Sequence, residues 1–235
     1  MATATPRESK RITYSSEIRA LKLVPFNPEQ MSIIKGALLG DGCLHAGWPG
    51  TSVNYVFSKT HSLKQREYVE WTCKKLQPFV IKEPYLYAPV QSLKMRTISH
   101  SALTALRKIF YPSGKKSLPK DIQSIISDPL AVAVWFMDDG NAFNSENATH
   151  GYHLNTQSFS KEDNERIKSV FKRIYDIDCS VQKNNCKYRI FVRVASMEKF
   201  AGMIYPHIIP SMMYKLGSIG DSLRTRRDWI PAQAG

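Results

Sequence analysis

Two stretches of the chain are apolar on almost every side of a helix, and both run into an acid. They contain "GALLGDG" at 36–42 and "AVWFMDDG" at 133–140. Asn27-Pro28 and Asp128-Pro129 precede them, a pattern typical of a helix start because the first residue caps and proline suits the first helical position. We therefore predict two buried helices. The glycine after each acid is expected to adopt a left-handed conformation.

Shorter periodic segments follow each apolar helix. The runs "VNYVFSKT" (53–60) and "GYHLNTQS" (151–158) resemble strands, and capped amphipathic helices are expected after Ser62 and Ser160. The run "KYRIFVRVAS" (187–196) alternates strictly, so Tyr188, Ile190, Val192 and Val194 should share one face and Lys187, Arg189, Phe191 and Arg193 the other. Residues 45–52 and 140–150 read as loops. Closing helices are expected at 101–111 and 196–205.

These segments form an internal repeat. Asp41 and Asp139 are 98 positions apart, as are Ser62 and Ser160, and Lys116 and Lys215 are 99 apart. The pattern predicts an α+β fold of two pseudo-symmetric αββαββα units, the single-chain equivalent of a dimer. We divide the chain into an N-terminal basic arm (1–26), a first unit with its linker (27–125), a second unit (126–220) and a C-terminal tail (221–235).

Charge and composition narrow the class of partner. The chain has 33 Lys+Arg against 20 Asp+Glu, a net charge of +13, which favours a nucleic-acid partner over a merely soluble basic surface. Its four cysteines form no CxxC pair, which argues against a structural zinc site and favours free thiols in a reducing compartment. The chain has no apolar run long enough to span a membrane, and its N-terminus lacks the apolar segment of a secretory signal peptide. We therefore expect an intracellular protein without a membrane span.

The two acids predict a metal site. A helix C-terminus carries partial negative charge, so a carboxylate repeated there requires a compensating cation. Oxygen ligands favour Mg²⁺ or Mn²⁺, and small Gly36, Ala37 and Gly40 would let the two helices approach closely. Asp41 and Asp139 would then meet and hold a metal able to activate water. Asp138 is expected to be a solvated or supporting acid.

Lys116 and Lys215 are candidates to stabilise charge on a phosphate. A single lysine in so basic a chain is commonly just solvated, but repetition at nearly the same offset favours a shared role.

The two motif stretches resemble the degenerate motif copies of the LAGLIDADG homing endonucleases. The resemblance covers about residues 27–220 and extends to "LNTQSF" (154–159) and "IPSMMYKL" (209–216), which are most similar to a single-chain mitochondrial intron endonuclease of that family. It implies two four-stranded, saddle-shaped antiparallel sheets that grip the DNA major groove, packed through the motif helices. It also implies one metal-binding aspartate per motif, Asp41 and Asp139, with Lys116 and Lys215 as the basic active-site pair, and double-strand breaks with 3′ overhangs.

The same resemblance implies a monomer that binds double-stranded DNA at a long asymmetric site. It suggests a mitochondrial or chloroplast location. Bidentate side chains on a two-stranded ribbon discriminate bases in the major groove, and each can instead contact phosphate or solvent. The candidates are Lys59, Lys94, Arg96, Gln157, Arg189 and Arg193.

Two other functions fit the same scaffold. One is an RNA-binding intron maturase, and the other is a DNA-binding protein that does not cut. The acids and lysines in both halves favour the metal-dependent endonuclease.

Overall fold

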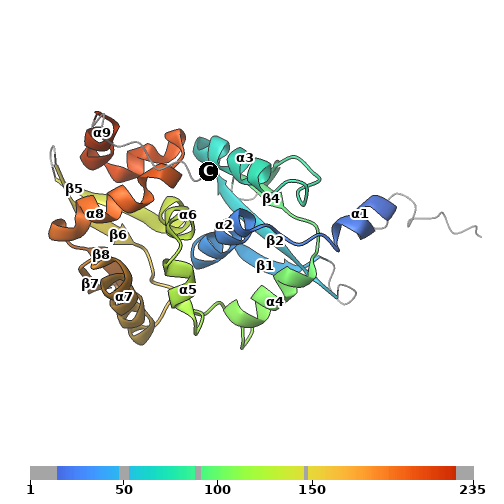
Figure 1. Ribbon diagram of the computed structural model, residues 1–235, viewed down its shortest axis with the longest axis horizontal. Coiled ribbons are helices and arrows are strands. Elements are labelled where there is room, and N and C mark those ends of the chain that lie inside the picture. Colours follow the sequence, from blue (N-terminus) through green and yellow to red (C-terminus); the bar gives the residue numbers. More distant parts are fainter. Residues whose placement is uncertain (1–14, 48–52, 88–90, 146–147, 226–235) are drawn as a thin grey trace, which may run out of the picture.

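The computed structural model describes residues 15–47, 53–87, 91–145 and 148–225 of the chain. The two apolar helices, α2 (Pro28–Leu39) and α6 (Pro129–Asp139), lie side by side at its centre (Figure 1). Asn27 caps α2 by accepting the Gln30 N–H at 2.8 Å, and Asp128 caps α6 by accepting the Leu130 N–H at 2.9 Å. Because every residue from 131 to 138 is buried, α6 is a core helix, as predicted.

A matching set of strands and helices surrounds each central helix. The first unit continues as β1 (Cys43–Ala46), β2 (Tyr55–Ser62), the 3-10 turn η2 (Leu63–Gln65), α3 (Arg66–Lys75), β3 (Tyr85–Tyr87), β4 (Ser92–Arg96) and α4 (Ser101–Phe110). The second continues as β5 (Gly140–Ser145), β6 (Ala148–Leu154), α7 (Lys161–Tyr175), β7 (Cys179–Asn184), β8 (Lys187–Val192) and α8 (Val194–Ile204).

Both sheets are four-stranded and antiparallel, with the equivalent orders β1-β2-β4-β3 and β5-β6-β8-β7. The predicted α+β class and the repeated αββαββα order are confirmed. The remaining described elements lie outside the repeat: α1 (Ser16–Leu21), α5 (Ile122–Ile126), η4 (Tyr205–His207), η5 (Pro210–Leu216) and α9 (Ser218–Thr225).

Strand register decides which side chains each sheet turns away from its helices. On β2, Phe57 and Lys59 are buried against the helices, so Ser58 and Thr60 face the other way. Their partners across the ladder are Arg96 and Lys94. We call this helix-free side of each sheet its open face.

The open face of the second sheet carries a different set of side chains. Ile190 and Val192 of β8 are in the core, which places Arg189 and Phe191 on the opposite side. Phe191 packs there against His153 and Phe143, with ring centroids 5.0 and 6.1 Å away.

Several local predictions were wrong. Residues 45–46, 140–145 and 148–150 were expected in loops but are strand residues, because they complete the outer ladder of each sheet. Residues 48–52 and 146–147 of the expected loops lie outside the described residues. Ser62 makes no side-chain cap, since β2 runs on to it and η2 follows. The strand predicted over 187–196 ends at Val192, and α8 begins at Val194, which is exposed.

The glycines after the acids are not left-handed. Gly140 has an extended backbone, with φ −88°, and Gly42 is not among the positive-φ residues. Close packing explains them instead. A Cβ at Gly140 would lie 2.1 Å from the Phe136 ring, and one at Gly42 would lie 2.7 Å from the Ala37 carbonyl oxygen.

The helix seam depends on Gly36. A Cβ there would lie 2.3 Å from the Ala131 carbonyl oxygen, a backbone atom of α6. In an ordinary helix Gly→Ala stabilises by about 0.5–1 kcal/mol. We expect Gly36→Ala to destabilise instead, by about 1–3 kcal/mol, because α2 and α6 must separate. Urea unfolding measures the sign, and a gain in stability would contradict close backbone contact at this seam.

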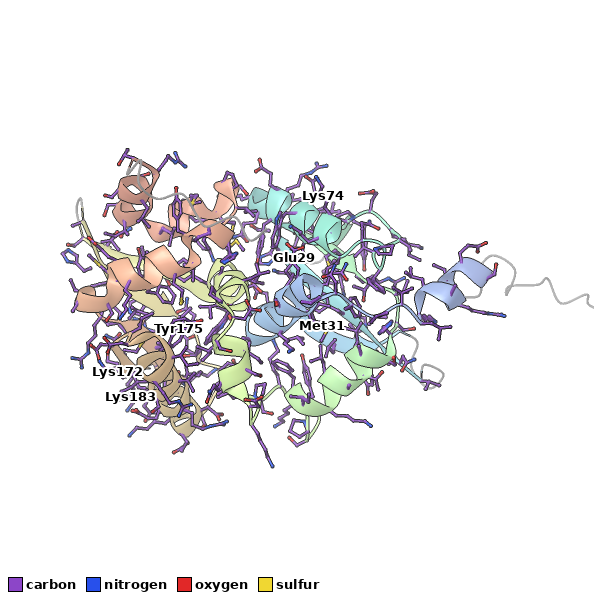
Figure 2. The ribbon with its side chains drawn as sticks, in the orientation of Figure 1. Glu29, Met31, Lys74, Lys172, Tyr175 and Lys183 are labelled. Carbon is purple, nitrogen blue, oxygen red and sulfur yellow. The ribbon has the colours of Figure 1, made fainter. Side chains whose placement is uncertain are left out.

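Part of the basic surplus lies on the rims of the two units, where Lys74 of α3, Lys172 of α7 and Lys183 of β7 are exposed (Figure 2). Residues 1–14 of the expected basic arm and 226–235 of the expected tail lie outside the described residues. Within the described ranges, no helix is long and apolar enough to cross a membrane.

Candidate functional site

Asp41 and Asp139 lie at the same end of the helix seam. Asp139 is the last residue of α6, and Asp41 follows α2 by two residues. Burial raises the pKa of Asp139 to about 7, and repulsion by Asp41 and Asp138 adds to the rise. The pKa of Asp41 is also raised, by burial and then by Asp138. The carboxylates of Asp41 and Asp139 therefore lie close enough to repel each other. The positive charge around them is not sufficient to offset their burial and this repulsion.

Each predicted lysine binds the end of its own motif helix. Lys116 Nζ donates to the carbonyl oxygens of Gly40 and Gly42, at 2.7 and 2.8 Å. Lys215 Nζ donates in the same way to those of Met137 and Asp138, at 2.5 and 2.8 Å. Burial lowers the pKa of both lysines, and the nearby aspartates oppose this shift. The ammonium groups of Lys116 and Lys215 thus offset the partial negative charge at the helix ends, where Asp41 and Asp139 also lie.

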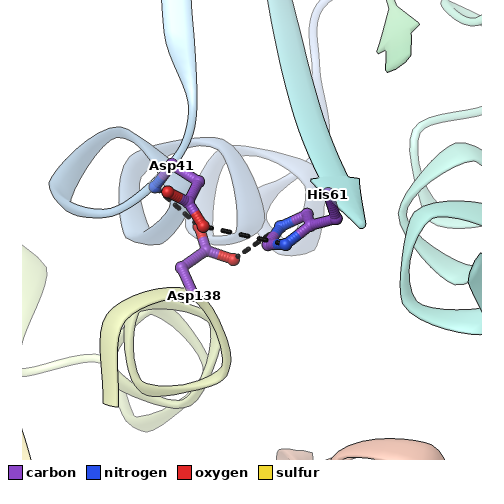
Figure 3. Close-up of side chains that lie close together, drawn as sticks. All are labelled: Asp41, His61 and Asp138. Carbon is purple, nitrogen blue, oxygen red and sulfur yellow. Dashed lines mark hydrogen bonds and ion pairs between the residues drawn. The ribbon is translucent and has the colours of Figure 1, made fainter. Parts of the chain in front are cut away.

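Asp138 is the centre of a buried cluster that includes His61 and Asp41 (Figure 3). Its Oδ1 pairs with Lys59 Nζ at 2.6 Å and lies 3.3 Å from His61 Nε2. The Tyr68 hydroxyl donates to the same oxygen at 2.8 Å. Burial alone would raise the pKa of Asp138, but Lys59 and His61 outweigh it and hold the pKa at about 2.

Two predictions are corrected by this cluster. Of the two roles expected for Asp138, that of a solvated acid is wrong, because its side chain is fully buried among donors. Lys59 does not face DNA, because it shares the helix-packed face of β2 with Phe57 and is 1% exposed. The alternation of β2 fixes this orientation, since the outward positions are Ser58 and Thr60.

Possible ligands for a divalent cation gather at this end of the seam. Asp41, His61 and Asp138 have ligand atoms within 4.8 Å of one another, and Asp139 is not in this group. Asp138 is a poor ligand, because Lys59, Tyr68 and the Asp41 N–H, at 3.2 Å, already occupy its oxygens. The Asp41 side chain is 43% exposed. Asp41 and the partly exposed Asp139 are thus the acids free to bind a cation, whose charge would relieve the repulsion that raises both pKa values.

The other predicted DNA contacts fall into two groups. Arg96 is exposed and Lys94 half-buried on the first open face, and Arg189 is half-buried on the second. Gln157 and Arg193 lie outside the strands: Gln157 is in the turn after β6, and Arg193 is the N-cap residue of α8.

Asp139→Asn is expected to stabilise the metal-free protein more at pH 8 than at pH 5. A pKa of about 7 means that the fold favours the protonated carboxyl, so stability is lost as pH rises from the ordinary pKa of an aspartate to about 7. Asn imitates the protonated form at every pH. We expect a gain of about 2 kcal/mol at pH 8, or several degrees in Tm. Thermal unfolding in EDTA at both pH values checks it, and an equal gain at pH 5 would contradict this explanation.

The sequence did not single out His61, Tyr68 or Gln65 as site residues. His61 Nδ1 lies 3.0 Å from Gln65 Oε1 and 3.7 Å from Asp41 Oδ2. One signal was available in the sequence. Phe57, Lys59 and His61 occupy every second position of a strand, which predicts that Lys59 and His61 point inward with Phe57. His100 is buried and caps α4.

Known proteins resemble the chain over most of its length. It is 27% identical over 207 residues to the cytochrome b mRNA maturase bI2 of Debaryomyces hansenii, covering 83% of this chain and 76% of the relative. It is 26% identical over 209 residues to the DNA endonuclease I-ChuI of Chlamydomonas applanata, covering 80% and 94%.

Solved structures share the fold. The homing endonuclease I-WcaI, solved bound to its DNA recognition sequence, superposes with a TM-score of 0.77 at 24% identity, covering 91% of this chain and 95% of that one. The model of the LAGLIDADG DNA endonuclease family matches residues 31–200. With that match spanning most of the chain, including both acids at the helix seam, the protein belongs to the LAGLIDADG DNA endonuclease family.

Proposed function

We propose that this protein is a site-specific homing endonuclease that makes metal-dependent double-strand breaks with 3′ overhangs and so promotes intron mobility. The observation that carries the proposal is the position of Asp41 and Asp139 at the same end of the α2–α6 seam, where burial raises the pKa of both carboxyl groups. Two adjacent acids held in a chain of net charge +13 suit a cation shared with a phosphate.

Asp41 and Asp139 would hold the metal, Mg²⁺ or Mn²⁺. When bound, it would supply a Lewis acid that activates water and stabilises the leaving oxygen. Lys116 and Lys215 hold the helix ends. Their ammonium groups would also stabilise negative charge on an incoming phosphate. Asn155 supports the second half, because its backbone and side-chain N–H groups both donate to the Asp139 carbonyl oxygen.

We propose that the two open faces read the major groove of double-stranded DNA. Lys94 and Arg96 would act from the first sheet and Arg189 from the second, with Arg193 and Gln157 at the margins. The first face is basic, whereas the second adds the aromatic group Phe143, His153 and Phe191. Faces of different chemistry favour a long asymmetric site, bound by one chain as a monomer.

The finer details are also proposals. The two units, 27–125 and 126–220, would each bind half of the target. In the chain they follow the arm (1–26) and precede the tail (221–235). The blocks "LNTQSF" and "IPSMMYKL" resemble I-SceI, a mitochondrial intron endonuclease. We propose a mitochondrial or chloroplast location.

The decisive experiment is selection of cleaved sites from a randomised duplex library with Mg²⁺ or with EDTA. We expect one long sequence to be enriched, with both strands cut only when metal is present. DNA binding without cutting in Mg²⁺ would favour the non-cutting DNA-binding protein instead.

The maturase is a second candidate because the chain matches the cytochrome b mRNA maturase bI2 over 83% of its length. It would bind RNA through the same basic surface and help an intron to fold. Splicing of the host intron measured with and without the protein tests this role. Splicing that depends on the protein, together with no DNA cleavage, would replace the endonuclease proposal.

A further inference from the structure

A buried ion pair crosses from one unit to the other. Lys59 comes from β2 of the first unit and Asp138 from α6 of the second, and neither side chain has any exposed surface. The Lys59 ammonium also lies 3.9 Å from the centre of the Tyr68 ring. Removing two charges from water is costly, and apolar residues of similar size commonly serve a core as well. A purely structural role therefore explains this pair poorly.

The ion pair contacts Asp41, one of the two aspartates proposed to bind the metal. Asp138 Oδ2 accepts the backbone N–H of Asp41 at 3.2 Å. Gly40 makes this approach possible, because a Cβ there would lie 2.5 Å from Asp138 Cβ. His61 lies beside both aspartates, 3.3 Å from the Asp138 carboxylate and 3.7 Å from that of Asp41, as Figure 3 shows. The backbone of Asp41 is thus bound directly to Asp138, and the two carboxylates share His61 as a neighbour.

The internal repeat shows that this arrangement is one-sided. At the offset of 98, Asp138 corresponds to Gly40 and Tyr68 to Arg166. The strand registers make Leu154 the counterpart of Lys59, because Cys43 pairs with Ser58 in the first sheet and Gly140 with Leu154 in the second. Leu154 is an apolar core residue, and Arg166 binds Asp163 and the carbonyl oxygens of Pro119 and Lys120. Among the described residues, no equivalent buried pair ties the backbone N–H of Asp139.

We infer that Asp138, held by Lys59 and Tyr68, is a positioning residue that fixes the Asp41 half of the site alone. The inference rests on the proposed nuclease function for its kinetic consequence: the two DNA strands depend unequally on this network. Loosening it changes the rate on one strand more than on the other. It also loosens the Asp41 backbone whether or not the protein cuts DNA.

The mildest variant is Tyr68→Phe, which removes only the hydroxyl that donates to Asp138. Asp138→Asn is the stronger one. On a target duplex with differently labelled strands, under single-turnover conditions with Mg²⁺, we expect the ratio of the two strand-cleavage rates to change by about tenfold in Asp138→Asn and less in Tyr68→Phe. A partly misfolded preparation has fewer active molecules, which lowers both rates equally and leaves the ratio unchanged.

Lys75→Met is the matched control. It breaks an exposed pair with Glu29 that also joins two helices, α2 and α3, of the first unit. We expect its strand ratio to equal that of the wild type. An unchanged ratio in both network variants, with both rates reduced alike, would overturn the positioning role and leave the nuclease proposal standing.

Amide hydrogen exchange gives a readout that needs no cleavage. The Asp41 amide should exchange about tenfold faster in Asp138→Asn than in the wild type. The Asn155 amide, which donates to the Asp139 carbonyl oxygen at 3.0 Å, should not change. Unchanged exchange at Asp41 would refute the inference. A wild type that fails to cut DNA but shows this selective change would refute the nuclease proposal instead.

Discussion

Replacing Asp41 or Asp139 with Asn is expected to abolish DNA cleavage, with a loss on the order of 10³-fold, while DNA is still bound. Asn keeps the size of the side chain but removes the negative charge that would hold the metal. Burial raises the pKa of both acids, and repulsion by Asp138 adds to the rise in each, so each is poised to gain from a divalent cation. Affinity should persist because the open faces are untouched.

Single-turnover cleavage with Mg²⁺, paired with a gel-shift assay, separates the two effects. Asp178→Asn is a suitable control because Asp178 is exposed and pairs with Lys172 on the outer side of the second unit. It should cut at the wild-type rate. Normal cleavage by either Asp41→Asn or Asp139→Asn would contradict the role assigned to that acid.

Lys59→Met is expected to reduce the free energy of unfolding by about 3–5 kcal/mol. The Asp138 carboxylate would stay buried without the cation that now lies 2.6 Å from it. Lys59→Met combined with Asp138→Leu should recover much of the loss, because it removes both charges together. Urea unfolding of the two variants measures the difference, and equal stability would contradict an essential pairing.

The same variant has a predicted pH dependence. In the wild type the pKa of Asp138 is held at about 2, so its stabilising effect is present at neutral pH and is lost as pH falls toward that value. Without Lys59, burial would raise this pKa above its ordinary value. The deficit of Lys59→Met should therefore shrink as pH falls from 7 toward 4. A deficit that stays constant over this range would show that the lost interaction is not ionic.

The sequence by itself determined the repeat and most of its elements. Asn27-Pro28 and Asp128-Pro129 encode helix starts through local capping, which needs no distant partner. The all-round apolar character of 131–137 required burial. The spacing of 98 between Asp41 and Asp139 was sufficient to place both acids at equivalent helix ends. Such features depend on residues a few positions apart, so a linear pattern records them.

Only the tertiary structure decided which residues the aspartates and the glycines contact. Gly42 and Gly140 were read as left-handed, yet they avoid contacts with Ala37 and Phe136 that depend on side-chain positions in space. The sequence left Asp138 as a solvated or supporting acid, because its neighbour Asp139 matched Asp41 in the repeat. Its partners Lys59 and Tyr68 are about 70 or more positions away in the chain, and only the packing of α6 against the first unit brings them together. Burial and long-range pairing set the charge state of a side chain, and neither is recorded by its sequence neighbours.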